Sequence, residues 1–348
     1  MSPSLSVLAS SATIDTVGTP WLWGGTIVVV LALLIFDFAL TRRPHEVSMR
    51  EAVGWTVFYI ALPVVFGVFL WFHNGGTPAT EFFTGYLLEK SLSVDNLFIF
   101  MLLLSAFAVP AALAQRVLLY GIAGALVLRG IFIALGAAAL ATLDWAFLLF
   151  GLILLVTAVK LLADAVSGHE QDVDISGMKS VRLLRRFWPV TDDYRGAKMV
   201  VTEPDPDQPS KLRRALTPLA LVVAAVMATD VVFAVDSVPA VYGVTGDPFL
   251  VFATNAFALL GLRALYFVLH AALSRLVHLA YGLAAILAFI GVKLVLHWAH
   301  GIWNGVPQIP TLASLLVIVV VLTTVTLTSL YATREARGHA PEPAADVP

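Results

Sequence analysis

The chain contains no cysteine. This absence excludes a disulfide framework, a thiolate zinc site and an iron–sulfur cluster, so any metal must be held by oxygen or imidazole. Charged residues are also scarce, at 13% of the chain against about 25% in a typical soluble domain. The formal net charge of −2 gives no indication of a nucleic-acid partner. Phosphate-loop and His-Glu-x-x-His motifs are missing too, so neither an ATP-driven pump nor a zinc intramembrane protease is expected.

Long apolar runs dominate what is present, because 59% of the 348 residues are hydrophobic. A membrane-spanning helix needs about 20 mostly apolar residues. The sequence therefore predicts an all-α, polytopic transmembrane helix bundle of about nine spans. The nine runs are 21–41, 52–72, 83–109, 117–138, 144–163, 215–241, 249–270, 276–297 and 310–332.

The positions of the 21 basic residues test this division. Five of them lie inside the proposed spans. All the others lie in the connections on one side of the membrane, and none lies in the connections on the other side. Cytoplasmic loops carry the Lys/Arg excess, so we expect a multi-pass protein of the bacterial inner membrane with an outer N-terminus and a cytoplasmic C-terminus. The first 20 residues contain no Lys or Arg, unlike a secretory signal, so the first run is predicted to be a retained helix.

These spans divide the chain into units. The one long connection, 164–214, is basic and Pro-rich; its segment Ser180–Trp188 could be an amphipathic helix on the inner leaflet, although an ordinary solvated loop fits better. The expected units are an extracytoplasmic N-terminus (1–20), two peripheral helices (21–72), a three-helix unit (83–163), the cytoplasmic loop (164–214), a second three-helix unit (215–297), a last span (310–332) and a disordered cytoplasmic tail (333–348).

The two three-helix units share an ordered set of polar residues. In each, an acid is followed by five residues, an Asp and a small polar residue, then by an arginine in the next span and a lysine in the span after it. Because each unit has an odd number of helices, the second enters the membrane from the opposite side, which predicts an inverted-topology repeat. The first set is Glu89, Asp95, Asn96, Arg129 and Lys160, and the second is Asp230, Asp236, Ser237, Arg263 and Lys293.

Together with Lys90, these units contain nine ionisable residues within the proposed spans. At about 2.5–3.5 kcal/mol each when lipid-facing, they would cost on the order of 25 kcal/mol, so they must face the protein interior or water. Pro239 favours a break or kink in the sixth span, and unwound backbone there would expose carbonyls near the midplane.

The acids, with their amide and hydroxyl neighbours, are hard oxygen ligands that suit Mn²⁺, Mg²⁺ or Ca²⁺. We expect them to form a site for a transported cation, with no permanently bound cofactor; the alternative is that they only pair with the bases to fix helix packing. The bases are expected to balance charge or gate the site, and Asp37 to form a surface pair with Arg42. The predicted metal ligands are Glu89, Asp95, Asn96, Asp230, Asp236 and Ser237; the charge-balancing set is Lys90, Arg129, Lys160, Arg263 and Lys293.

Three long stretches of the sequence are distinctive: Glu89-Lys-Ser-Leu-Ser-Val-Asp-Asn-Leu-Phe, Thr229-Asp-Val-Val-Phe-Ala-Val-Asp-Ser-Val-Pro-Ala and Asp247-Pro-Phe-Leu-Val-Phe-Ala-Thr-Asn-Ala-Phe-Ala-Leu-Leu-Gly-Leu-Arg-Ala-Leu-Tyr-Phe. Through them the chain resembles, over roughly residues 20–335, the TerC family of integral membrane proteins, which includes Alx-type manganese exporters. The resemblance implies a LysE-like fold, a role in Mn²⁺ efflux through the acidic motif residues, and links to tellurite resistance and pH response.

The sequence therefore predicts a secondary transporter that exports a divalent cation, manganese(II) by the resemblance, with protons as a plausible coupling ion. The alternative is a membrane scaffold of a metal or tellurite stress response that acts through loop 164–214. No nucleophile–base constellation stands out, so no enzyme is expected. Membrane lipid and the metal ion are the expected partners, and the oligomeric state is left open.

Overall fold

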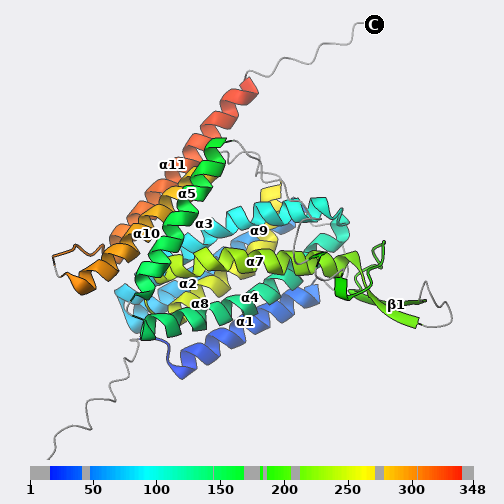
Figure 1. The fold of residues 1–348 in the computed structure, drawn as a ribbon, viewed down its shortest axis with the longest axis horizontal. Coiled ribbons are helices and arrows are strands. Elements are labelled where there is room, and N and C mark those ends of the chain that lie inside the picture. Colours follow the sequence, from blue (N-terminus) through cyan, green and yellow to red (C-terminus); the bar gives the residue numbers. More distant parts are fainter. Residues whose placement is uncertain are drawn as a thin grey trace, which may run out of the picture.

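The computed structural model describes residues 16–40, 48–143, 145–167, 181–182, 186–204, 212–270, 278–303 and 305–338. Within these ranges the chain is a bundle of long helices with one small hairpin at one end (Figure 1). The helices are α1 (Pro20–Leu40), α2 (Met49–Asn74), α3 (Gly76–Ala106), α4 (Ala111–Thr142), α5 (Ala146–Ser167), α7 (Pro218–Tyr242), α8 (Pro248–Leu260), α9 (Leu262–His270), α10 (Leu279–Ile302) and α11 (Thr311–Gly338).

Every predicted span coincides with a helix or, for 249–270, with the pair α8–α9. Helices form there because only a helix satisfies the backbone of a single spanning segment within lipid. In the described part of the chain, seven helices are long and apolar enough to cross a membrane, and the bent α8–α9 pair would be an eighth. The remaining helix, α3, carries Glu81, Glu89, Lys90 and Asp95, so it must be surrounded by protein. The all-α polytopic bundle is confirmed, while the count of nine spans stays a prediction.

The expected break in the sixth span is wrong. Helix α7 continues through Pro239 to Tyr242, because this proline lies in the last turn, where few further backbone bonds depend on it. The break lies instead at Gly261, where α8 and α9 meet at 41°. A Cβ atom on Gly261 would lie 3.0 Å from Lys90 Nζ and 3.1 Å from Tyr59 Cβ, so glycine allows both side chains to approach the interrupted backbone.

Helices α5, α10 and α11 form a group that crosses the other helices at an angle (Figure 1). Within it, α5 and α10 pack backbone against backbone, because a Cβ atom on Gly151 would lie 2.9 Å from Gly291 O. In lipid, helices associate through such small-residue packing rather than through the hydrophobic effect.

The two predicted three-helix units pack against each other through matching pairs of helices. Helix α4 of the first packs on α7 of the second, and α8 of the second packs on α3 of the first. A two-fold relation between the units would produce this pairing, although their inverted topology stays a prediction.

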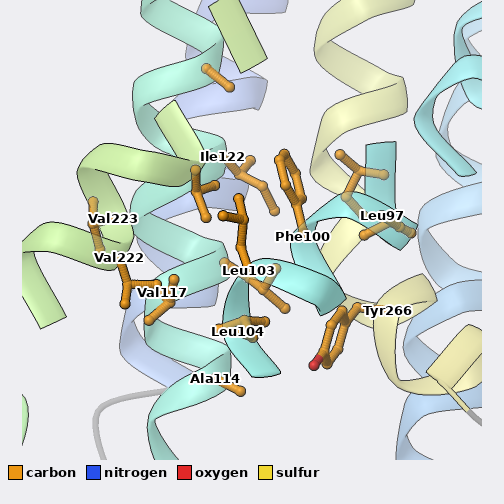
Figure 2. Close-up of a cluster of buried hydrophobic side chains, with 14 of the residues drawn as sticks. Leu97, Phe100, Leu103, Leu104, Ala114, Val117, Ile122, Val222, Val223 and Tyr266 are labelled. Carbon is orange, nitrogen blue, oxygen red and sulfur yellow. The ribbon is translucent and has the colours of Figure 1, made fainter. Parts of the chain in front are cut away.

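An apolar core holds α3 against its neighbours just beside the buried acids. Figure 2 shows side chains of α3, α4, α7 and α9 pointing toward one another. This packing fixes α3 along its second half, so the polar residues one or two turns earlier are held in a defined position. The labelled members are Leu97, Phe100, Leu103 and Leu104 of α3, Ala114, Val117 and Ile122 of α4, Val222 and Val223 of α7, and Tyr266 of α9.

The connection predicted as 164–214 contains folded structure. Strand β1 (Val200–Pro204) pairs antiparallel with β2 (Leu212–Leu216). The centre of the proposed amphipathic segment, 183–185, lies outside the described residues, as do the Pro-rich residues 205–210. Helix α11 continues to Gly338 and so includes the first six residues of the predicted disordered tail, while residues 339–348 are outside the described part.

Asp247 joins the N-terminal segment to the start of α8. Its carboxylate accepts hydrogen bonds from Thr16 Oγ1 (2.7 Å), Val17 N (2.6 Å) and Phe249 N (2.8 Å), the last of which caps the helix. The residue is only 6% exposed. Asp247, which lies just before the predicted span 249–270, is therefore buried and holds the N-terminal segment against α8.

Replacing Asp247 with alanine should lower the free energy of unfolding by about 2 kcal/mol, because a helix cap is lost and buried N–H groups lose their acceptor. Thermal unfolding in detergent micelles would measure this. Asp192→Ala, which removes an exposed carboxylate, is the matched control and should leave the unfolding temperature unchanged. Equal unfolding temperatures for both variants would show that the hydrogen bonds to Asp247 contribute nothing to stability.

Candidate functional site

The most deeply buried charges gather around Arg129, which is 1% exposed in the middle of α4. Its Nε and Nη2 donate to the two carboxylate oxygens of Asp230 in α7, at 3.1 and 3.0 Å. Its Nη1 donates to Glu89 Oε1 in α3 and to Asn255 Oδ1 in α8, the latter at 2.9 Å. Four helices thus converge on one guanidinium group, whose planar fork suits such multidentate binding.

This cluster joins the first acids of the two predicted units, and both are buried, with Glu89 0% and Asp230 1% exposed. When both carboxylates are ionised, the single guanidinium leaves the cluster one negative charge in excess. The interpretation that Arg129 neutralises these acids agrees with its contacts.

Asn255 is a site residue that the sequence interpretation missed. Its Nδ2 donates to Val251 O at 2.9 Å, which turns its Oδ1 toward Arg129. The sequence did contain a signal for it. Asn255 is a lone amide in an otherwise apolar run, within one of the three stretches that carry the family resemblance.

Several polar atoms around the cluster are buried and have no hydrogen-bond partner among the described residues. Three of them belong to predicted ligands, and the fourth lies one turn from Glu89 on the same face of α3. Leaving such a group unsatisfied costs about 1–3 kcal/mol, so their concentration in one place requires an explanation. Hydroxyl, amide and carboxylate groups held in this way are available to a ligand. The atoms are Glu89 Oε2, Ser93 Oγ, Asn96 Nδ2 and Ser237 Oγ.

A cavity of about 400 Å³ lies next to this cluster, between α3, α5, α7 and α10. Three predicted ligands line it: Asn96, Asp236 and Ser237. Asp236 is within electrostatic reach of Glu89 and Arg129, so the cavity and the ion-paired cluster form one polar region. Five of the six predicted ligands are therefore brought together; the side chain of the sixth, Asp95, lies outside the described part of the structure.

The predicted four-carboxylate site stays a prediction, because the side chain of Asp95 lies outside the described residues. Among the described side chains, no three His, Asp or Glu residues are grouped closely enough to hold a metal. The physical reason is that the Arg129 guanidinium lies between Glu89 and Asp230.

Three of the predicted charge-balancing residues have other partners than the predicted ligands, although one of them, Lys90, is within electrostatic reach of Glu89. Lys90 Nζ donates to Ala258 O (3.2 Å) in the last turn of α8, where a cation complements the helix dipole. Lys293 is within electrostatic reach of Glu81, near the N-terminal end of α3. The third is Arg263.

Arg263 in α9 differs from its counterpart Arg129. It donates to Asp37 Oδ1 in α1 (2.8 Å) and to Gln115 Oε1 in α4 (3.1 Å). The expectation that Arg263 neutralises the acids of the proposed site is therefore wrong. The surface location expected for Asp37 is also wrong, since Asp37 is 2% exposed; Arg42 lies outside the described residues.

Comparison with known proteins identifies the family. A family model described as "Integral membrane protein TerC family" matches residues 74–337. A Myxococcus xanthus membrane protein, STKORF319, is 39% identical over 337 residues, covering 97% of this chain and 99% of its own. The Escherichia coli (strain K12) protein described as "Putative membrane-bound redox modulator Alx" is 42% identical over 292 residues, or 81% of this chain and 88% of that protein.

A Mycobacterium tuberculosis membrane protein, MT2795, is 42% identical over 294 residues, covering 83% of this chain and 72% of its own. No solved structure matches the chain. With a family model that spans most of its length and a relative that aligns over 97% of it, this multi-pass membrane protein belongs to the TerC family.

Proposed function

We propose that the protein is a secondary transporter that exports Mn²⁺ across the inner membrane, with protons as the coupling ion. The observation that carries the proposal is the Glu89–Arg129–Asp230 cluster, buried at the crossing of four helices and adjoining a cavity with further oxygen ligands. Ionisable groups at such depth in a membrane protein mark ion pathways by default.

The cluster has the charge and chemistry of a cation site in which the Arg129 guanidinium takes the place of the metal ion. Arg129 holds two carboxylates one charge short of neutrality, whereas a divalent cation in its place would neutralise both. Carboxylate, amide and hydroxyl oxygens are ligands that Mn²⁺ accepts readily. Binding would then require the guanidinium to move away from Glu89 and Asp230, and release would allow it to return.

Proton coupling follows from the same carboxylates. A buried acid can be neutralised by a proton or by part of a divalent charge, but it gains little from both at once. Protons that enter from the acidic side would displace the metal from Glu89 and Asp230. An inward proton gradient could drive Mn²⁺ outward through this competition.

A second candidate function is the membrane scaffold, which the folded β1–β2 hairpin favours. Val200 and Leu212 of this hairpin are 48% and 72% exposed, so it presents apolar side chains to a partner. The name of the Escherichia coli relative suggests redox modulation; a thiol mechanism is excluded for this chain, which has no cysteine.

Purified protein in liposomes with an imposed pH gradient tests the transporter proposal. Glu89→Gln and Asp230→Asn should each reduce Mn²⁺ transport at least about tenfold. Each change removes a charged metal ligand from a site of low dielectric constant, where the attraction between charges is strong. Glu203→Gln, which removes a carboxylate that pairs with Arg213 on the hairpin, is the matched control and should transport like the unaltered protein.

Parallel assays with Ca²⁺ and Mg²⁺ establish the substrate among the hard divalent cations. Full Mn²⁺ transport by both acid variants would refute the proposed site. Loss of metal tolerance in cells on deleting the hairpin, with no loss in the acid variants, would favour the scaffold instead.

A further inference from the structure

The cavity between α3, α5, α7 and α10 has a second polar wall. Of the residues in this wall, only Lys160 was among the predicted site residues. Helix α5 contributes Thr157, Lys160 and Asp164 to it. Their spacings of three and four residues place them on one face of the helix. Asn96 of α3 and Asp236 and Ser237 of α7 line the same cavity, so polar groups from three helices share it.

These groups require water or an ion between them. Asn96 and Ser237 are 4% and 1% exposed, and their Nδ2 and Oγ atoms have no partner among the described residues. No ion pair within the described ranges involves the carboxylate of Asp164 or Asp236. Dry burial of such groups would cost several kcal/mol. With about 400 Å³, the cavity has room for on the order of ten water molecules.

The lining favours cations. Asp164 and Asp236 contribute two negative charges when both are ionised, against one positive charge from Lys160, so the wall is negative in that state. A concave, low-dielectric surface of one sign concentrates ions of the other sign. Thr157, Asn96 and Ser237 supply neutral oxygen atoms that can replace part of a cation's hydration shell.

The cavity also extends in depth. Asp164 lies three residues before the end of α5 at Ser167, whereas Asn96 and Ser237 are buried beside the Arg129 cluster. A cation that entered near Asp164 would pass Thr157 and reach Asp236, which is in electrostatic reach of Glu89.

We propose that this cavity is a hydrated access chamber for a divalent cation, in which Asp164 attracts the ion, Thr157 guides it to Asp236, and Lys160 limits occupancy by competing for the same carboxylates. The assignment rests on the proposed transport function for the identity of the ion. Its physical content, an aqueous and cation-selective chamber, can be tested separately.

Thiol labelling tests the chamber directly, since the chain has no cysteine of its own. Thr157→Cys, purified in detergent, is treated with 2-(trimethylammonium)ethyl or 2-sulfonatoethyl methanethiosulfonate, and each rate is divided by that of a free thiol. The cationic reagent should react about tenfold faster than the anionic one, because the negative wall concentrates it. Added Mn²⁺ should slow the labelling.

Second-site changes in the Thr157→Cys background assign the preference to named groups. Asp164→Asn should reduce the ratio of cationic to anionic labelling, and Lys160→Met should increase it. Asp193→Asn, which removes an exposed carboxylate outside the cavity, should leave the ratio unchanged.

Failure of both reagents to label Thr157→Cys, while an exposed Asp193→Cys reacts, would overturn the chamber, because the space would then be dry or filled by lipid. Equal normalised rates for the two reagents would overturn its cation selectivity. Preferential cationic labelling without protection by Mn²⁺, in a protein that transports no Mn²⁺, would support the chamber and refute the manganese assignment of the proposed function.

Discussion

Replacing Arg129 with methionine should lower the free energy of unfolding by about 3–5 kcal/mol at neutral pH, since it leaves an uncompensated buried charge. Glu89 and Asp230 would lose their shared partner, and both are almost completely buried. Thermal unfolding of the purified protein in detergent micelles measures the loss. Arg213→Met, which breaks the partly exposed pair with Glu203, is the matched control, and its effect should stay below about 1 kcal/mol.

Two treatments should rescue the Arg129→Met variant if buried charge causes the loss. Protonation of Glu89 or Asp230 removes that charge, so the folded state takes up protons and its stability should rise as the pH falls. Mn²⁺ should stabilise this variant more than the unaltered protein, because the guanidinium no longer competes for the two carboxylates.

The combined variant Arg129→Met, Glu89→Gln, Asp230→Asn supplies the internal check, because it contains no unpaired charge and should recover most of the stability. An Arg129→Met variant that unfolds at the normal temperature, at neutral pH and without metal, would show that the acids do not depend on Arg129. Equal destabilisation of the combined variant would assign the effect to side-chain packing instead.

Replacing Gly151 with leucine should prevent α5 from packing against α10. Even a Cβ atom at Gly151 would lie 2.8 Å from Val295 Cγ2 and 2.9 Å from Gly291 O, and the latter is backbone that cannot rotate away. Overpacking costs about 1–3 kcal/mol, occasionally more, and a branched side chain at a backbone contact belongs to the upper part of this range. The variant should unfold at a lower temperature and transport less Mn²⁺, since α5 and α10 form two walls of the cavity.

Gly130→Leu is the matched control for this prediction. Gly130 is also inside a helix, α4, but nothing lies within 4 Å of a Cβ atom placed there. Its unfolding temperature should be unchanged or slightly higher, because leucine favours helix more than glycine does. Equal unfolding temperatures for the two leucine variants would contradict the close contact between α5 and α10.

The helices were predictable because their signal is local. A run of about 20 apolar residues specifies a helix in lipid whatever its neighbours are, and each predicted span coincides with a helix or the α8–α9 pair. Helix α3 shows where this reasoning reaches its limit. Its run was recognised, but its charges become tolerable only because other helices surround it.

The break in the bundle was predicted at the wrong place for a related reason. Pro239 is a local signal for a break, yet α7 contains it without interruption. Gly261 carries a weaker local signal, and the chain bends there, where Lys90 and Tyr59 approach its backbone from other helices. Such an approach cannot be deduced from residues near Gly261 in the sequence.

By itself, the sequence determined that the protein is helical and membrane-embedded, and that Glu89, Asp230 and Arg129 lie buried among apolar residues; these conclusions depend only on composition and on the cost of charge in lipid. Only the tertiary structure decided that both acids bind Arg129, while the corresponding Arg263 binds Asp37 and Gln115. The two arginines occupy equivalent positions in the predicted repeat, so the sequence cannot distinguish their partners. The choice depends on how the helices cross and at what depth their side chains meet, which is a property of the packed bundle.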